Sequence, residues 1–324
     1  MRIISSEEIA SALTVPALVE ALREGFRQSI VTPLRHHHSM ATPENGENFM
    51  LLMPAWTDRS HGDSKTGSFA GVKLVTVYPE NPSDDRPTVQ GQYLLIDATT
   101  GEFLAALDGT VLTLWRTAAA SALAASYLAR EDARHMVMVG AGAMAPYLVR
   151  AHMAVRPIRS VSIWNRNMDK AEALAQSLRQ DGIEANADDD LESSVSRADL
   201  ISCATVSTEP IVHGAWLKDG AHVDLMGAFT PQHRETDDKV MARGRVYVDT
   251  MEGALKEAGD IVQAMSSGAL RPEDIVADLF GLCRGITAGR VTKDEITVFK
   301  SVGTALEDLV AAQYVYEQIV KSGK

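Results

Sequence analysis

A glycine-rich turn between an apolar strand and a helix constrains the fold of this chain more than any other feature. Residues 135–139 (HMVMV) have the pattern of a buried strand, and residues 140–145 (GAGAMA) follow it directly, before a helical segment. This is the G-x-G-x-x-G/A pattern in the strand–turn–helix context that a dinucleotide-binding unit requires. The first glycine permits the tight turn, the second lets the backbone approach a pyrophosphate, and the last small residue keeps helix and strand close. We therefore expect a Rossmann domain whose cofactor contacts include Gly140, Ala141, Gly142, Ala143, Met144 and Ala145.

The region around this turn alternates strands and helices, which predicts a parallel, doubly wound sheet. The predicted strands are residues 135–139, 160–164, 199–204, 221–226 and 245–249, and the predicted helices include 168–180 and 232–242.

The N-terminal part predicts a different architecture. A short strand at 2–4 precedes a helix capped near Ser5 or Ser6, with Glu8 able to close a capping box. After a helix at 16–30, no helix separates the β-like runs, so we expect an antiparallel or mixed sheet. These runs are residues 49–53, 71–78, 89–97 and 103–108, and the polar stretches 54–68 and 80–87 are interpreted as ligand-covering loops.

Two helices set the predicted domain boundaries. The small apolar residues 117–128 predict a helix that connects the domains. A last helix at 301–320 is long enough to pack back on the first domain. We therefore expect an α+β domain from residues 1–116 and 301–324, and a Rossmann domain from 117–300, with 117–130 as the connection.

Composition excludes several classes of function. The formal net charge is -12 and no Lys/Arg cluster occurs, which argues against nucleic-acid and membrane-surface binding. The N-terminus does not have the pattern of a signal peptide, and no apolar stretch is long enough to span a bilayer. Cys203 and Cys283 are isolated, so we expect neither a disulfide nor a zinc site, and a cytoplasmic protein. Adjacent imidazoles at His36–His38 would point to opposite faces of a strand, so no metal is expected.

The residues that follow the second predicted strand are the ones expected to contact the cofactor's ribose. An acid there would accept a hydrogen bond from the 2′-hydroxyl of NAD, but the chain has Asn165-Arg166-Asn167. A guanidinium holds a 2′-phosphate through paired, charge-assisted bonds, so we expect NADPH, with NADH also possible. The alternative is that Arg166 is a solvated charge at the end of a strand.

An ordered set of motifs along nearly the whole chain resembles the ornithine cyclodeaminase/mu-crystallin family. Each motif alone is unspecific, whereas their order is distinctive. They are residues 52–55 (LMPA), 71–73 (GVK), 116–119 (RTAA), 140–145 (GAGAMA), 164–166 (WNR), 208–211 (TEPI), 247–249 (YVD), 297–303 (TVFKSVG) and 305–308 (ALED).

The resemblance implies that the domain formed by residues 1–116 and 301–324 binds a carboxylate-bearing substrate and forms a homodimer. The family's carboxylate-binding cations match Arg35, Lys73 and Arg116, and Thr88 matches a further substrate position. Each of these cations, taken alone, is typical of a surface charge, Arg35 most of all, whereas the order of the family motifs favours a site role for Lys73 and Arg116. Because residues 117–128 are predicted as helix, we also expect Arg116 at a helix N-terminus, which favours an anion. Further cofactor-binding positions are expected at Thr117, Asn165, Arg166, Thr205, Val206, Met226 and Val302.

The segment GAFTP at 227–231 departs from part of the family. In its cyclodeaminases and alanine dehydrogenases the position of Phe229 is an aspartate that serves proton transfer and contacts the amine. Phe229 cannot ionise, whereas its ring suits the methylenes of a cyclic imine. With Thr230 beside it, this segment resembles the branch that reduces Δ1-pyrroline-2-carboxylate to L-proline.

The reaction we expect is hydride transfer from NADPH to C2 of a protonated cyclic ketimine. Lys73 and Asp108 are the candidate catalytic residues; Asp108 would orient or protonate the imine nitrogen, or is alternatively a turn residue before Gly109. Ring size stays open between pyrroline and piperideine, the latter giving L-pipecolate. The rivals are ornithine cyclodeaminase, L-alanine dehydrogenase, and an NADP-dependent ligand-binding protein of mu-crystallin type.

Overall fold

The computed structural model describes residues 1–42, 47–60, 67–78, 80–81 and 86–321. The chain forms two compact units: Met1–Thr117 with Thr304–Lys324, and Ala118–Gly303. A parallel sheet with helices makes the second unit, and a mixed sheet with helices from both chain ends makes the first. The predicted fold class is therefore confirmed.

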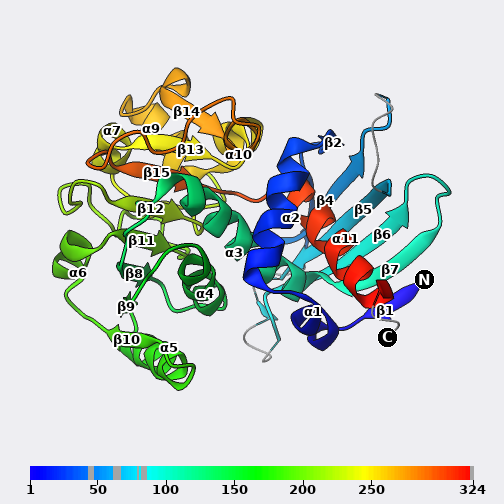
Figure 1. The fold of residues 1–324 in the computed structure, drawn as a ribbon, viewed down its shortest axis with the longest axis horizontal. Helices are drawn as coiled ribbons and strands as arrows, with labels where there is room; N and C mark the ends of the chain where they lie inside the picture. The colour runs from blue at the N-terminus through cyan, green and yellow to red at the C-terminus, as the bar shows by residue number, and fades with distance from the viewer. Residues whose placement is uncertain (43–46, 61–66, 79, 82–85, 322–324) are drawn as a thin grey trace. The chain divides into compact units, whose positions relative to one another are not determined.

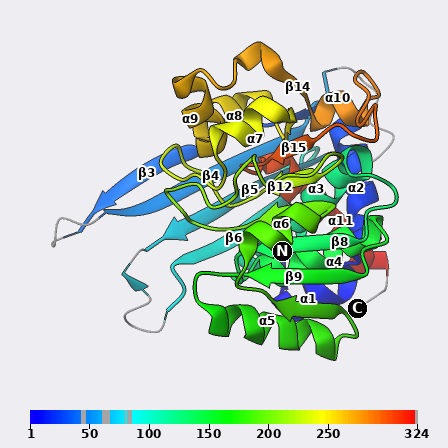
Figure 2. The same ribbon diagram turned by 90° about the vertical axis from the view of Figure 1, so that its left-hand side faces the viewer.

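The first unit is built on a seven-stranded sheet in which five strands follow one another in antiparallel pairs. Its one parallel pair joins β1 to β7, and β3 pairs with β4 in a long hairpin, visible in Figure 2. The order is β1 (Arg2–Ile4), β7 (Phe103–Asp108), β6 (Val89–Asp97), β5 (Phe69–Val77), β4 (Glu47–Thr57) and β2 (Ile30–Val31), with β3 (His36–Ala41) off this path.

Helices α1 (Ser6–Ala12), α2 (Val15–Arg27) and α11 (Ala305–Lys321) complete this unit. In Figure 1, α2 in blue and α11 in red lie side by side over the sheet. A Cβ on Gly25 would come within 2.4 Å of Val310 Cγ2, so glycine allows the two helices to approach closely. The predicted capping box of α1 is present, because Ser5 Oγ accepts from Glu8 N and Ser5 N donates to the Glu8 carboxylate.

Helix α3 (Gly109–Leu128) begins eight residues before the predicted start at Thr117. The cause is Asp108, whose Oδ1 accepts hydrogen bonds from Thr110 N and Val111 N at 2.9 and 3.0 Å and caps the helix. Arg116 therefore lies inside the helix. The expectation that it sits at a helix N-terminus was wrong.

The second unit is an eight-stranded sheet in which every pair is parallel. The order is β10 (Glu184–Ala187), β9 (Ser160–Trp164), β8 (His135–Val139), β11 (Leu200–Cys203), β12 (His222–Leu225), β15 (Thr297–Lys300), β13 (Arg245–Val248) and β14 (Ile275–Asp278). Its helices are α4 (Ala145–Val155), α5 (Met168–Gln180), α6 (Leu191–Arg197), α7 (Asp238–Arg243), α8 (Met251–Glu257), α9 (Gly259–Ser267) and α10 (Leu279–Cys283), with a 3-10 turn at Pro272–Asp274.

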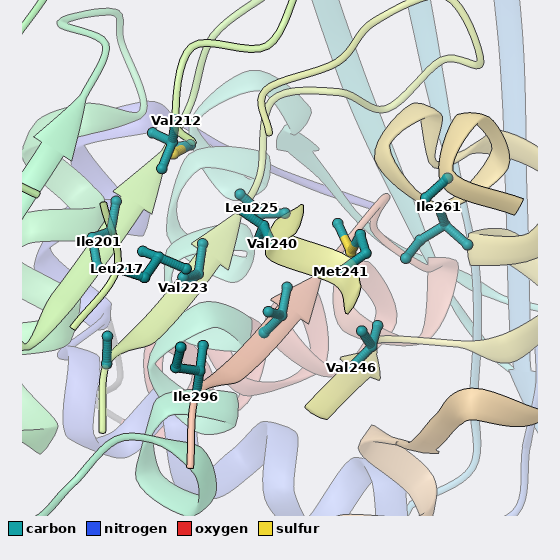
Figure 3. Packing of buried hydrophobic residues seen from close by; sticks show 14 of the residues in the cluster. Ile201, Val212, Leu217, Val223, Leu225, Val240, Met241, Val246, Ile261 and Ile296 are labelled. Carbon is teal, nitrogen blue, oxygen red and sulfur yellow. The ribbon is translucent and has the colours of Figure 1, made fainter. Parts of the chain in front are cut away.

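Apolar side chains from the central strands and from the helices beside them form the core of this unit (Figure 3). Val223, Leu225 and Val298 are fully buried on neighbouring strands, and Val240 and Ile261 from α7 and α9 pack with them. Four-residue strands buried on both faces explain why this region lacks alternation in its sequence.

One helix prediction for this unit was wrong, and one central strand was not predicted. Residues 232–236 are not helical, because their backbone bonds to the 207–212 segment: Ile211 N and Val212 N donate to Glu235 O. Helix α7 begins only at Asp238, capped by Asp237. In the sheet, β15 (Thr297–Lys300) lies between the strands predicted at 221–226 and 245–249, and no strand was predicted for its residues.

The remaining differences are local. The last helix begins at Ala305 rather than residue 301, because Gly303 has a φ of 80° and its N–H donates to Asp249 Oδ2. Residues 54–57 of the predicted loop 54–68 belong to β4, while 61–66 and 82–85 of the two predicted loops lie outside the described residues. Within the described ranges, no helix is long and apolar enough to cross a membrane, and no His/Cys/Asp/Glu group is arranged to hold a metal.

Candidate active site

The glycine turn of the second unit has the geometry that its sequence predicts. Gly140 has a φ of 105°, and a Cβ there would lie 2.6 Å from Ala204 O, so the turn requires glycine. A Cβ on Gly142 would meet no atom within 4 Å and would instead fill open space. Helix α4 starts at Ala145, and its N-terminus has N–H groups without intrahelical acceptors, which favour an anion.

A cavity of about 480 Å³ opens beside this turn. It brings together seven of the predicted cofactor residues: Gly140, Ala141, Gly142, Asn165, Arg166, Thr205 and Val206. Sequence reasoning missed six more lining residues: Trp164, Asn167, Lys170, Ala204, Ser207 and Ile211. The open space at Gly142 and the helix N-terminus beside it fit the pyrophosphate of a dinucleotide.

One end of the cavity is cationic. Arg166 and Lys170 line it, and none of the lining residues among those described is acidic. Asn165 Oδ1 accepts from Ala141 N at 3.3 Å and so links the end of β9 to the glycine turn. Asn167 caps α5 by accepting hydrogen bonds from Asp169 N and Lys170 N. This cap fixes the backbone of the first helical turn, which carries Lys170.

Other predicted positions in this unit do not line that cavity. Ala143, Met144 and Ala145 form the entry into α4, and Met226 and Val302 are 9% and 8% exposed. Phe229 is 46% exposed and Thr230 is half-buried; Thr230 Oγ1 lies 3.1 Å from His233 Nδ1.

Two predicted cations meet two carboxylates in the first unit. Lys73 on β5 and Arg116 on α3 are 2% and 5% exposed, and both contact the first turn of α11. Lys73 Nζ lies 2.9 and 2.8 Å from the two oxygens of Asp308. Arg116 Nε donates to Asp308 Oδ1 at 2.9 Å, and its Nη1 donates to Glu307 Oε2 at 2.6 Å. We call these four residues the ion cluster.

The charges of the ion cluster influence one another strongly. Burial and the neighbouring charges of Arg116 and Arg35 lower the pKa of Lys73 to about 8, although Asp308 opposes this shift. Burial disfavours the charged form of Arg116, but Asp308 and Glu307 outweigh it and raise the pKa of Arg116. Two cations and two carboxylates make up the ion cluster, and the charge of the half-buried Arg35 is also close enough to act on Lys73.

The other predicted residues of the first unit have local roles that the structure describes. Thr88 is half-buried, and its carbonyl accepts from Tyr78 N at 2.8 Å. Thr117 is half-buried in α3. Asp108 caps that helix, which supports its interpretation as a turn residue.

Sequence reasoning missed the two acids of the ion cluster as partners of the cations. Glu307 and Asp308 are fully buried, although they are adjacent acids. The sequence around the two acids could have revealed their burial. Residues 305–312 (ALEDLVAA) are otherwise small or apolar, so the two acids lie within a buried stretch and require partners.

Comparisons with known proteins cover the whole chain. The model of the ornithine cyclodeaminase/mu-crystallin family matches residues 2–323. The Delta(1)-pyrroline-2-carboxylate reductase of Paracoccus denitrificans is 41% identical over 288 residues, 88% of this chain and 90% of its own.

Solved structures agree with this match. The Delta(1)-pyrroline-2-carboxylate reductase of Thermococcus litoralis, in complex with NADH and L-proline, superposes with a TM-score of 0.91 at 31% identity and covers 100% of this chain and 98% of its own. An archaeal alanine dehydrogenase dimer with bound NAD has a TM-score of 0.89 at 29% identity and covers 100% of this chain and 97% of its own.

Proposed function

This chain belongs to the ornithine cyclodeaminase/mu-crystallin family, and from that premise we propose that it reduces a cyclic ketimine carboxylate with NAD(P)H. The substrate that we assign is Δ1-pyrroline-2-carboxylate, with L-proline as product. Δ1-piperideine-2-carboxylate, which would give L-pipecolate, is the six-membered counterpart. The two pyrroline-2-carboxylate reductases to which the chain is similar support the reaction class.

Phe229 is the observation that carries this choice over the family's other reactions. Its half-exposed ring follows β12 and meets the edge of the His233 ring, with 5.8 Å between centroids. Residues 227–231 contain no acid, and the next carboxylate, Glu235, is fully buried and accepts hydrogen bonds from backbone N–H groups. The turn therefore presents an apolar ring that suits methylene groups and no carboxylate for amine chemistry.

The ion cluster is the proposed site for the substrate carboxylate. Lys73 and Arg116 lie against Asp308 and Glu307, and Arg35 is close enough to influence the charge of Lys73, so an incoming carboxylate would meet three cations. Asp308 and Glu307 hold the two buried cations in fixed positions before substrate arrives, which lowers the cost of ordering them. We propose that Arg35, Lys73 and Arg116 bind the carboxylate together, with Thr88 near it.

The residues of the second unit would hold the cofactor. When bound, the reduced nicotinamide supplies the hydride that saturates C2 of the imine. The glycine turn and the N-terminus of α4 would bind the pyrophosphate, and Arg166 with Lys170 would bind a 2′-phosphate. We therefore propose that NADPH is preferred and NADH accepted. We also retain Met226 and Val302 as proposed cofactor contacts.

The proposed reaction does not require the protein to donate a proton to the imine nitrogen during hydride transfer. A protonated ketimine beside a carboxylate already accepts hydride, so the chain needs to stabilise that cation rather than create it. Asp108 stays a candidate for orienting the imine nitrogen, in addition to its capping role.

We further propose a cytoplasmic homodimer. The alanine dehydrogenase that superposes on the full length of this chain is a dimer. Cys203 and Cys283 are both buried and neither forms a disulfide, which suits a reducing compartment.

The test is a substrate comparison with the purified protein. We expect oxidation of NADPH with Δ1-pyrroline-2-carboxylate, and formation of L-proline. Release of ammonia and proline from L-ornithine would identify a cyclodeaminase instead, and reduction of NAD(P)+ with L-alanine an alanine dehydrogenase. No turnover of any of these, together with tight binding of NADPH, would indicate a binding protein of mu-crystallin type.

A further inference from the structure

Two turns that follow neighbouring strands of the parallel sheet are in direct contact. One turn, residues 204–207, follows β11 and lines the cofactor cavity. The other, residues 227–229, follows β12 and carries Phe229. A Cβ on Gly227 would lie 2.0 Å from Thr205 O, so only glycine allows the turns to approach this closely. Their relative position is therefore tightly defined.

The carboxylate of Glu235 bonds to both turns. Its Oε1 accepts from Thr205 N at 2.7 Å and from Thr205 Oγ1 at 2.9 Å. Its Oε2 accepts from Gly227 N at 2.8 Å and from Ala228 N at 3.4 Å. The residue is fully buried, so no water competes for these donors. One side chain thus fixes a wall of the cofactor cavity against the turn that carries Phe229.

The backbone next to Glu235 holds the rest of that wall. Arg234 N donates to Ser207 O at 2.7 Å, and Glu235 O accepts from Ile211 N at 2.9 Å. Ser207 and Ile211 both line the cavity. The segment around Glu235 therefore supports the lining from Thr205 to Ile211.

Two buried charges hold Glu235 in place. Asp260 on α9 accepts from Glu235 N at 3.0 Å and from Thr236 N at 2.9 Å through Oδ1. Lys300 on β15 places Nζ 3.3 Å from Asp260 Oδ2 and 4.0 Å from Glu235 Oε2. All three side chains are fully buried, so Lys300 is the nearby cation that offsets the two acids.

We propose that Glu235 is a positioning residue: as a carboxylate it holds the Thr205 and Gly227 turns in the geometry that binds the nicotinamide dinucleotide. The proposal rests on the proposed function only in requiring that the cavity binds this cofactor. It explains why an acid is retained in the interior, where charge is costly. An amide cannot replace it, because its NH₂ group would face the N–H groups of one of the two turns.

The same arrangement makes cofactor binding depend on pH. Burial and Asp260 raise the pKa of Glu235 to about 7, although Lys300 opposes this shift. The thiol of Cys203 is the other titratable neighbour, and burial and Glu235 raise its pKa well above the ordinary value. His233 lies two residues away in the sequence, so a variant of His233 serves as a control.

The experiment measures the dissociation constant of NADH by fluorescence, without any ketimine. NADH is chosen because it lacks the 2′-phosphate, whose second proton titrates near 6. At about pH 8 we expect Glu235→Gln to weaken NADH binding at least about tenfold, since a carboxylate that accepts several backbone hydrogen bonds is lost. For the wild type we expect about tenfold weaker binding at about pH 6 than at about pH 8, as ionised Glu235 falls from about nine-tenths to one-tenth.

Two variants serve as controls. Asp224→Asn changes another fully buried carboxylate of this unit, whose partners Ser121, Ser202 and His152 do not line the cavity. We expect it to keep the wild-type NADH affinity even where its melting temperature falls. His233→Gln is expected to keep the pH dependence, whereas Glu235→Gln loses it.

Wild-type NADH affinity in Glu235→Gln at about pH 8 would overturn the proposal. If that variant does not fold, the wild type and His233→Gln test the proposal. A wild-type NADH affinity that is constant between about pH 6 and about pH 8 would refute the proposal, and so would a pH dependence that disappears in His233→Gln. A wild-type protein that binds NADH normally but does not reduce ketimines would overturn the proposed substrate and leave the role of Glu235 standing. A wild type that binds neither NADH nor NADPH would overturn both.

Discussion

The ion cluster leads to a prediction about the alkaline side of the pH profile. Lys73 has a pKa of about 8, lowered from 10.5 chiefly by burial. In the proposed site, only the cationic form of Lys73 would attract the substrate carboxylate. The protonated fraction falls from about nine-tenths at pH 7 to about one-tenth at pH 9, so kcat/KM for the ketimine is expected to fall about tenfold over this range.

The variant Lys73→Arg tests the assignment. Its guanidinium stays charged throughout this range, so the alkaline fall is expected to disappear, even if the longer side chain lowers kcat/KM at every pH. The assay is initial-rate oxidation of NADPH across the pH range at limiting ketimine. A fall that persists unchanged in Lys73→Arg would refute the reasoning, because the titrating group would then be the imine or another residue.

Deprotonation of Lys73 does not destabilise the fold, so unfolding through this lysine cannot explain the expected fall of kcat/KM at alkaline pH. A shift from 10.5 to about 8 corresponds to about 3 kcal/mol between the two protonation states. Because the folded pKa is depressed, the unfolded chain binds more protons between about pH 8 and 10.5. The contribution of Lys73 to stability therefore rises with pH in that window, while activity falls.

Three further predictions concern the cofactor, the substrate and stability. Arg166→Ala is expected to raise the KM for NADPH about tenfold to a hundredfold with little effect on NADH, because a charge-assisted phosphate contact is lost; equal effects would mean that Arg166 does not touch the phosphate. Phe229→Asp is expected to lower kcat/KM for the ketimine at least about tenfold, because it places a charge against an apolar ring, and ammonia release from ornithine by the wild type would contradict the role of Phe229. Arg116→Ala is expected to lower the free energy of unfolding in urea by about 3–5 kcal/mol, because Glu307 and Asp308 lose a buried partner; a loss below about 1 kcal/mol would show that the cluster relaxes.

Features that depend on neighbouring residues were predictable from the sequence. The Ser5–Glu8 capping box, the strand at 135–139 and the glycine turn at 140–145 are set within a few residues and agree with the structure. The bounds of β6, β7, β9 and α5 were also predicted correctly.

Features that depend on distant contacts were not predictable in the same way. Arg116 meets its acids 191 and 192 residues further along the chain, and Lys73 meets Asp308 across 235. Residues 232–236 have a helical pattern, but hydrogen bonds to the 207–212 segment override it. Glu235 had no sequence signal, because an acid within a segment predicted as helix is typical of its solvated face.

The position of α11 at the end of the chain affects synthesis. Lys73 and Arg116 leave the ribosome with no counter-ion, and the whole parallel-sheet unit is made before Glu307 and Asp308 follow. At about 5–20 residues per second, the 192 residues between Arg116 and Asp308 take roughly 10–40 s to translate. Throughout that interval the first sheet lacks both its covering helix and the charges that allow its cations to be buried. The first unit of the nascent chain therefore remains incomplete until α11 has been made.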